Sequence, residues 1–218
     1  MNYFSRSWHE DVGFLPILDL FNHSDRKGNT VIKPAGGQHM ALKTRVDYKK
    51  GEQVYSSYSR HDMATFALNY DYFDPDGVHF IDYASRALHA IKTNVKQKTF
   101  ELVRAEYGGQ FFDMNGVRHF KIAAKNLLFL ENAPSFKLLN YFKMVIQIEA
   151  GLTKQNPTDQ LILETLLANI NAFISAIQVD KYDVKDVPEK LHRFYFMSQK
   201  EKAMLLNNRD WVIDNFTM

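Results

Sequence analysis

The spacing of apolar residues changes once along this chain, and that change constrains the fold more than any other feature. From about Gly13 to Tyr83 the apolar residues come in short runs separated by turn formers, which is typical of strands. From about Thr93 onward they recur every three or four residues, which is typical of helices. We therefore predict an α+β protein in which a short-stranded β unit precedes an all-α helical unit.

The first unit is expected to cover residues 1–84. Its apolar runs alternate with polar residues over strand-like lengths, and one later stretch has a helical stripe. Gly51 suits a turn because glycine takes positive φ without strain. The predicted elements are strands over 14–18, 40–46 and 53–58, with the last two joined as a hairpin through the turn 47–52, and a helix over 62–70.

The second unit is expected to cover residues 85–218 and to be helical throughout. Asn156 and Pro157 have the residue types preferred at an N-cap and at the first helical position. Ser198 and Glu201 have capping-box spacing, so a helix is expected to begin at Gln199. The predicted helices are 95–107, 136–148, 157–177 and one beginning at 199, and the core seam of the third is Leu163, Leu166, Ile170, Phe173 and Ile177.

Composition narrows the classes of function. The 218 residues are 45% hydrophobic, enough to bury one good core or two small ones. Lys and Arg number 27 against 25 acids, and this balance disfavours a nucleic-acid partner. No cysteine is present and the histidines fit no metal motif, so we predict no metal. No apolar run approaches the roughly 20 residues of a bilayer span, so we expect an intracellular protein without a membrane span.

Three motifs in the first unit carry a resemblance. Asp19-Leu20-Phe21-Asn22-His23-Ser24 closes an apolar run, Gly51-Glu52-Gln53-Val54-Tyr55-Ser56-Ser57-Tyr58 follows about 30 residues later, and the segment from Ala67 to Phe73 comes after a short helix. In this order and spacing they resemble the later half of a SET domain of the Rubisco large-subunit methyltransferase type, which includes the actin-histidine methyltransferases. The helical remainder is similar in layout to that family's C-terminal substrate-binding domain.

The resemblance implies a protein N-methyltransferase that uses S-adenosylmethionine and modifies lysine or histidine. By the resemblance, Asn22 would bind the cofactor through its side-chain amide, and His23 would contact the adenine chiefly through its backbone. Tyr58 would orient the methyl group and the target nitrogen, which makes it the candidate catalytic residue. Tyr70 and Tyr72 would line the far wall of the pocket and offer an aromatic face to the adenine or the sulfonium.

Each candidate residue also has a structural interpretation from the sequence alone. Asn22 is a turn former at a strand end, and His23 suits a partly buried structural position. Tyr58 suits the end of a strand, with its hydroxyl in contact with solvent. Tyr70 and Tyr72 fit a core as readily as a pocket wall. Both interpretations stay open at this point.

The chain departs from the family pattern in ways that bear on activity. The family's Gly-x-Gly cofactor loop has no counterpart, so we expect a C-terminal part of a family member that is not active alone. Within the matched motifs, Ser59 and Asp71 stand where the family has glycine, and Asp62-Met63 replaces a Ser-Asn pair. Residues 29–34 contain no aromatic residue at the place of the family's lysine-channel tyrosine, which favours histidine or no target.

Two functions from different classes therefore remain. The chain is either the C-terminal part of a methyltransferase acting on a protein substrate, or a non-catalytic scaffold derived from such an enzyme. In the second case a protein partner would cover the sheet edge left by the incomplete SET domain.

Overall fold

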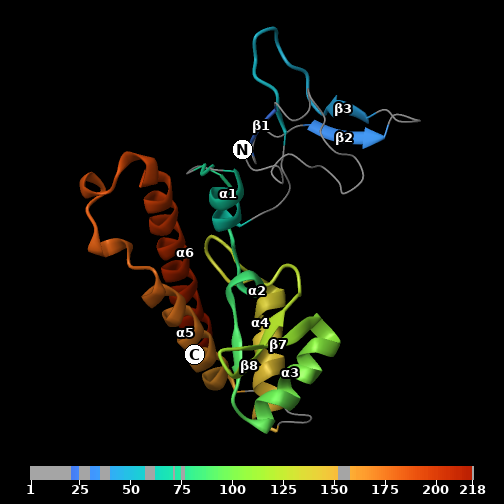
Figure 1. Ribbon diagram of the computed structural model, residues 1–218, viewed down its shortest axis with the longest axis vertical. Helices are drawn as coiled ribbons and strands as arrows, with labels where there is room; N and C mark the ends of the chain where they lie inside the picture. The colour runs from blue at the N-terminus through green and yellow to red at the C-terminus, as the bar shows by residue number, and fades with distance from the viewer. Residues whose placement is uncertain are drawn as a thin grey trace. The chain divides into compact units, whose positions relative to one another are not determined.

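The computed structural model describes residues 21–24, 30–34, 40–56, 62–70, 72–74, 77–151 and 158–217. The chain divides into two compact units, an N-terminal unit of residues 1–79 and a C-terminal unit of residues 80–218. Both units contain helices and strands, so the architecture is a mixed α+β one, as predicted (Figure 1). The predicted strand over 14–18 lies outside the described residues.

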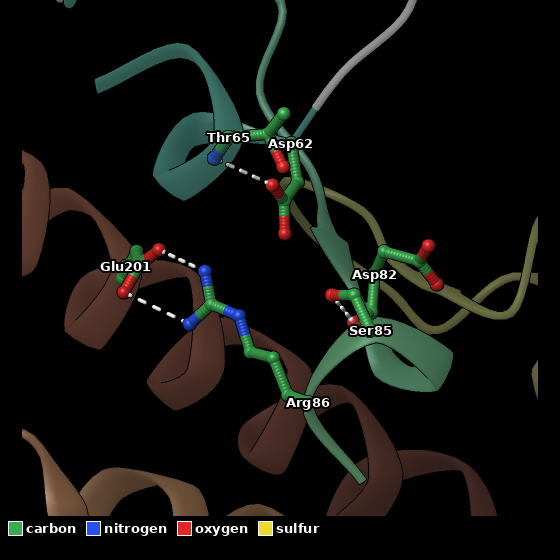
Figure 2. A network of polar contacts seen from close by, with 6 residues as sticks. All are labelled: Asp62, Thr65, Asp82, Ser85, Arg86 and Glu201. Atoms are coloured by element: carbon green, nitrogen blue, oxygen red, sulfur yellow. Dashed lines mark hydrogen bonds and ion pairs between the residues drawn. The ribbon is translucent and has the colours of Figure 1, made fainter. Parts of the chain in front are cut away.

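The described part of the N-terminal unit contains short strands and one helix. Strand β1 (Asn22–His23) pairs in parallel with β4 (Tyr55–Ser56), and β2 (Thr30–Pro34) pairs antiparallel with β3 (Met40–Thr44). Helix α1 spans Met63–Tyr70 and buries Met63, Phe66 and Ala67, which confirms the helix predicted over 62–70. Asp62 caps it by accepting a 2.9 Å hydrogen bond from the Thr65 N–H (Figure 2).

The predicted hairpin between residues 40–46 and 53–58 is wrong, although its turn forms. Lys49 N–H donates to a Glu52 carboxylate oxygen at 2.9 Å, and Gly51 takes φ +92°. After this turn, β4 pairs with β1 rather than with β3. The strand beside β3 is β2, whose Thr30-Val31-Ile32 run is β-branched and therefore suited to a strand.

The C-terminal unit is not all-helical, which corrects the sequence-based prediction. Strands β6 (His89–Ile91), β8 (Val117–Ile122) and β7 (Gly109–Met114) form an antiparallel sheet in that order, and β5 (Ile81–Asp82) pairs with β9 (Leu128–Phe129). Asn115 and Gly116 join β7 to β8 with φ values of +54° and +74°. This Asn-Gly pair is a strong hairpin signal, which the helical periodicity around it obscured.

Helices make up most of the rest of the C-terminal unit. Thr93 and Ser135 cap the starts of α3 and α4, and Gly108 ends α3, so these two helices have nearly their predicted bounds. Thr158 caps α5, because its side chain accepts a hydrogen bond from the Leu161 N–H, and the predicted N-cap Asn156 lies outside the described residues. The helices are α2 (Tyr83–Arg86), α3 (Asn94–Tyr107), α4 (Phe136–Glu149), α5 (Asp159–Ala176) and α6 (His192–Phe216), with 3₁₀ turns at Val179–Lys181, Val184–Asp186 and Glu189–Leu191.

Helix α6 starts earlier than predicted. The capping-box prediction placed a helix start at Gln199, but α6 runs without a break from His192. The residues from 192 to 198 contain neither glycine nor proline, so nothing interrupts the helix before Ser198. Within the part that was predicted, Met204 and Leu205 are buried.

An aromatic cluster forms the centre of the C-terminal unit. Tyr83 is buried and lies 5.2 Å from Phe142, 5.6 Å from Tyr141 and 5.9 Å from Phe173, measured between ring centroids. Its hydroxyl donates a 3.3 Å hydrogen bond to Asn169 Oδ1. Burial raises the pKa of both Tyr83 and Tyr141, so both hydroxyls stay protonated.

The stretch Asp159–Lys181, which contains α5, has the length and composition of a membrane span, although the sequence analysis found no such run. It packs beside α6 and α4 and buries Ile162, Leu163, Leu166 and Ile170. Its exposed residues are polar or small, as on a surface helix of a folded domain: Asp159, Gln160, Glu164, Ala168, Asn171, Ala172, Ser175 and Ala176. The absence of a membrane span therefore stays a prediction.

Alanine at Gly109 is expected to destabilise the C-terminal unit by about 2–4 kcal/mol. Gly109 has φ +140°, and an added Cβ would clash with the Phe120 ring and lie 2.6 Å from the Lys121 carbonyl oxygen. Gly116 also has positive φ, but it has open space around it, so Gly116→Ala should cost only about 1 kcal/mol. Urea unfolding of both variants checks this, and equal losses would show that packing at Gly109 is not tight.

The stability of the C-terminal unit is expected to fall as the pH drops from about 6.5 to about 4 because of His89. Burial, with Lys96 and Lys121 nearby, lowers the pKa of His89 to about 4. The ring lies 4.6 Å from Phe100 by centroids, and Nε2 is 3.2 Å from the Tyr141 hydroxyl. As the pH falls, the unfolded chain therefore takes up the proton before the folded chain does. The free energy of unfolding falls by at most about 2–3 kcal/mol over this range.

The matched variant for this prediction is His89→Gln, which keeps a hydrogen-bonding group and does not titrate in this range. Urea unfolding at pH 7 and pH 4.5 should show a steeper loss in the parent chain than in the variant. Identical pH slopes would mean that His89 is not held neutral by the fold.

Candidate functional site

A parallel strand pair brings two of the sequence motifs together. Asn22 lies opposite Tyr55 and His23 opposite Ser56 in the β1–β4 register, and the Ser24 N–H donates a 3.2 Å hydrogen bond to the Ser56 carbonyl. His23 and Ser56 are buried, whereas Asn22 is exposed. The Asn-His-Ser segment thus lies beside the strand that leads, two residues later in sequence, to Tyr58.

The rings around His23 bring three of the predicted site residues close together. The His23 imidazole stacks on Phe66 with a centroid distance of 4.5 Å and an interplanar angle of 29°. Tyr72 meets the same imidazole edge-on at 5.5 Å, and Tyr70 lies 5.6 Å from Phe66. His23, Tyr70 and Tyr72 therefore share one aromatic cluster whose centre is Phe66.

The two other predicted site residues are Asn22 and Tyr58. Asn22 adjoins the cluster through the chain and is exposed, so its amide is accessible to a ligand. Tyr58, the candidate catalytic residue, lies outside the described residues, as do Ser59 and Asp71. The proposed roles of these residues stay predictions.

A small hollow opens beside the aromatic cluster within the N-terminal unit. It encloses about 280 Å³ of empty space, part of which is open solvent. Its walls come from β1, from α1 and from the segment that follows α1: His23, Met63, Phe66, Tyr72, Phe73, Asp74, Val78 and His79. Two of the predicted site residues thus line this hollow, His23 as a buried residue and Tyr72 as a half-buried one.

The walls of the hollow are aromatic, with one carboxylate. Phe73 stacks on His79 at 5.4 Å with an interplanar angle of 22°. Asp74 begins a turn in which its carbonyl accepts a 3.1 Å hydrogen bond from the Gly77 N–H. Burial raises the pKa of the neighbouring Tyr70, so its phenol remains uncharged. Such walls suit a flat aromatic ligand or an organic cation better than an anion.

Sequence reasoning missed several residues of this hollow. Phe66 lies within the helix predicted over 62–70 but was not predicted as a site residue, because a ring that packs on a site residue has the same spacing as a core residue. Phe73, Asp74 and His79 follow α1 in a segment without periodicity, and only the folded chain brings them beside His23. No group of three His, Asp or Glu side chains that could hold a metal occurs among the described residues.

Comparisons of the chain with protein-family models, with curated proteins and with solved structures found no match.

Proposed function

We propose that the N-terminal unit carries the later half of the S-adenosylmethionine pocket of a SET-type protein N-methyltransferase, and that the C-terminal unit binds the protein substrate. The observation that supports this most is the β1–β4 pair, which joins Asn22-His23-Ser24 to the strand leading to Tyr58. Two motifs about 30 residues apart in sequence are thereby paired as neighbouring strands. A SET-type pocket requires this pairing, whereas a chance match of the motifs would not.

The reaction needs little from the protein beyond positioning. Methyl transfer to nitrogen is an in-line displacement, and holding both reactants in line can lower the barrier by about 7–11 kcal/mol. The bound cofactor supplies the methyl group on a sulfonium, which leaves as a neutral thioether. In this proposal Asn22 and the His23 backbone hold the cofactor, and the Tyr58 hydroxyl oxygen orients the methyl group and the neutral target nitrogen.

The residues of the hollow suit part of the cofactor. Tyr72, which is only half-buried, offers aromatic surface to an adenine or a sulfonium. The hollow is shallow and far smaller than a typical small-molecule site, so it could form only part of the wall of a cofactor pocket. The remaining contacts would come from a Gly-x-Gly segment, which these 218 residues do not contain. We therefore expect weak cofactor binding by this chain alone. Because residues 29–34 contain no aromatic residue, we expect histidine rather than lysine as the target.

Calorimetric titration with S-adenosylmethionine tests the proposal. The chain is titrated alone and together with a SET N-terminal half that carries the Gly-x-Gly loop. This mixture is called the completed assembly. Saturable binding should appear or strengthen at least tenfold in the mixture, and Asn22→Ala should remove most of the gain. Asn69→Ala, an exposed asparagine on α1, is the matched control. A calorimetric blank with folded material in both states would overturn the proposal.

A non-catalytic scaffold is the second candidate, and one observation favours it. Phe66 already stacks on the His23 imidazole, so ring surface that a ligand could use is covered by the protein itself. In this case the site is structural, and a protein partner covers the short strands of the N-terminal unit. The scaffold predicts a chain that aggregates alone and becomes monodisperse with its partner. A stable monomer in size-exclusion chromatography with light scattering would count against it.

A further inference from the structure

We infer that β7 is a dimerisation edge, along which two copies of this chain pair antiparallel and join their sheets into one. The pairing is centred on Phe112, so that Asp113 of each copy lies opposite Phe111 of the other. The inference concerns the C-terminal unit alone and does not depend on the proposed methyltransferase function.

The first support is an open sheet edge. β7 is the outer strand in the order β6-β8-β7, and β8 is its only strand partner among the described residues. Its sequence, Gly-Gln-Phe-Phe-Asp-Met, contains neither proline nor lysine, the residues that commonly protect an edge. The opposite edge strand, β6, is only 3 residues long, and short edge strands resist pairing. β7 has 6 residues, so it offers another strand a longer row of backbone hydrogen-bonding groups.

The second support is a pair of arginines beside this edge. Around the Phe111 ring of β7, the Arg104 Cζ lies 5.9 Å and the Arg118 Cζ 5.2 Å from the ring centroid. Both arginines are exposed, and neither forms an ion pair with another residue of the described chain. The Phe111 ring packs on that of Phe120, with 5.0 Å between centroids. Two cations beside one edge residue favour an acidic side chain at the facing position of an added strand.

The third support is that β7 itself carries such an acid. Asp113 is exposed, and it lies opposite Arg118 of its own chain without forming an ion pair within the described chain. Phe111 and Asp113 lie on the same face of the sheet, because strand side chains alternate between faces. An antiparallel pairing centred on Phe112 places residue 111 of one copy opposite residue 113 of the other. Each Asp113 carboxylate then comes beside the arginine pair of the second copy, and two-fold symmetry provides this contact twice.

Charge also disfavours the neighbouring register. A pairing centred on Phe111 would bring the arginine pairs of both copies together, and like charges would repel. On the other face of the sheet, centring on Phe112 places two half-buried Phe112 rings opposite each other, and aromatic cross-strand pairs stabilise a sheet. A contact along one strand buries less area than a standard interface, so we expect a weak dimer with a Kd of about 10–300 μM.

A cysteine cross-link tests the register, because the chain contains no cysteine of its own. Gln110 and Met114 are exposed, and the pairing places each opposite the other. Gln110→Cys and Met114→Cys, mixed at about 100 μM and mildly oxidised, should form a disulfide-linked dimer. Each variant alone should cross-link at least tenfold less, because two copies of one residue would lie about 13 Å apart, beyond the roughly 7 Å that a disulfide spans.

The matched control for the cross-link is Gln110→Cys mixed with Ser175→Cys, an exposed residue on α5. This mixture should react no faster than either variant alone. A mixture of Gln110→Cys and Met114→Cys that reacts no faster than this control would overturn the inferred register.

Sedimentation equilibrium of the full chain tests the charge pairing. Asp113→Lys and the double variant Arg104→Glu/Arg118→Glu should each weaken self-association at least tenfold. Their equimolar mixture should regain dimers, because every new charge then faces its opposite. Asp214→Lys, at an exposed position on α6, should leave the Kd within about twofold. A parent chain that stays monomeric at about 500 μM, or a mixture that does not associate, would overturn the inference.

Discussion

Tyr58→Phe is expected to slow methyl transfer by the completed assembly about 100- to 1,000-fold and to leave the S-adenosylmethionine affinity within about threefold. The hydroxyl is proposed to act on the methyl group as it moves, so its interaction strengthens in the transition state and contributes little to ground-state binding. Transfer of a radiolabelled methyl group to protein, measured under single-turnover conditions, checks the rate, and calorimetry checks the affinity.

Tyr55→Phe is the matched control for Tyr58→Phe. Tyr55 lies on β4, and its hydroxyl donates a 3.0 Å hydrogen bond to Gln53 Oε1 at the surface. Its loss should change the transfer rate less than about threefold. Full activity of Tyr58→Phe, or equal losses in the two variants, would remove Tyr58 from the site.

Glu201→Ala is expected to destabilise the C-terminal unit by about 3 kcal/mol. The Arg86 guanidinium forms a bidentate ion pair with Glu201: Nη1 donates to Oε2 at 3.1 Å, and Nη2 donates to Oε1 (Figure 2). The Glu201 side chain is only 6% exposed and that of Arg86 is 23% exposed, so removal of the acid leaves a largely buried guanidinium without its carboxylate. The partial exposure of Arg86 places the cost at the lower end of the range for buried pairs.

The neighbouring ion pair between Lys200 and Glu131 provides the comparison. Its side chains are 30% and 49% exposed at a separation of 2.7 Å, so Glu131→Ala should cost less than about 1 kcal/mol. Urea unfolding of the two variants measures the difference. Equal losses would show that burial of the Arg86–Glu201 pair contributes nothing beyond the pairing itself.

The helices were predictable from the sequence where local signals define them. Helix α3 begins after Thr93 and ends at Gly108, and α1 follows Asp62, because capping side chains and glycine act within a few residues of a helix end. Three of the five predicted seam residues, Leu163, Leu166 and Ile170, are buried, since a helical stripe faces the core where the helix packs. The other two, Phe173 and Ile177, are half-buried near the end of α5. The helix start predicted from the capping-box spacing at Ser198 is wrong, because the same residues are compatible with a helix interior.

Strand pairing was less predictable, because partners distant in the sequence decide it. Nothing local distinguishes a β4 that pairs with β3 from one that pairs with β1, and the choice depends on the whole N-terminal unit. The same limit applies to the site. The resemblance pointed to His23, Tyr70 and Tyr72, and the folded chain brings their rings together, but the contribution of Phe66 and Asp74 emerges only from that folding.

Hydrogen exchange of the completed assembly with and without S-adenosylhomocysteine tests the central claim most directly. If the β1–β4 pair forms half of the cofactor pocket, the ligand should slow exchange at residues 21–24 and 53–58 and in the segment after α1, with little change in α5 and α6. Protection confined to the C-terminal unit, or no protection at saturating ligand, would contradict the proposed site.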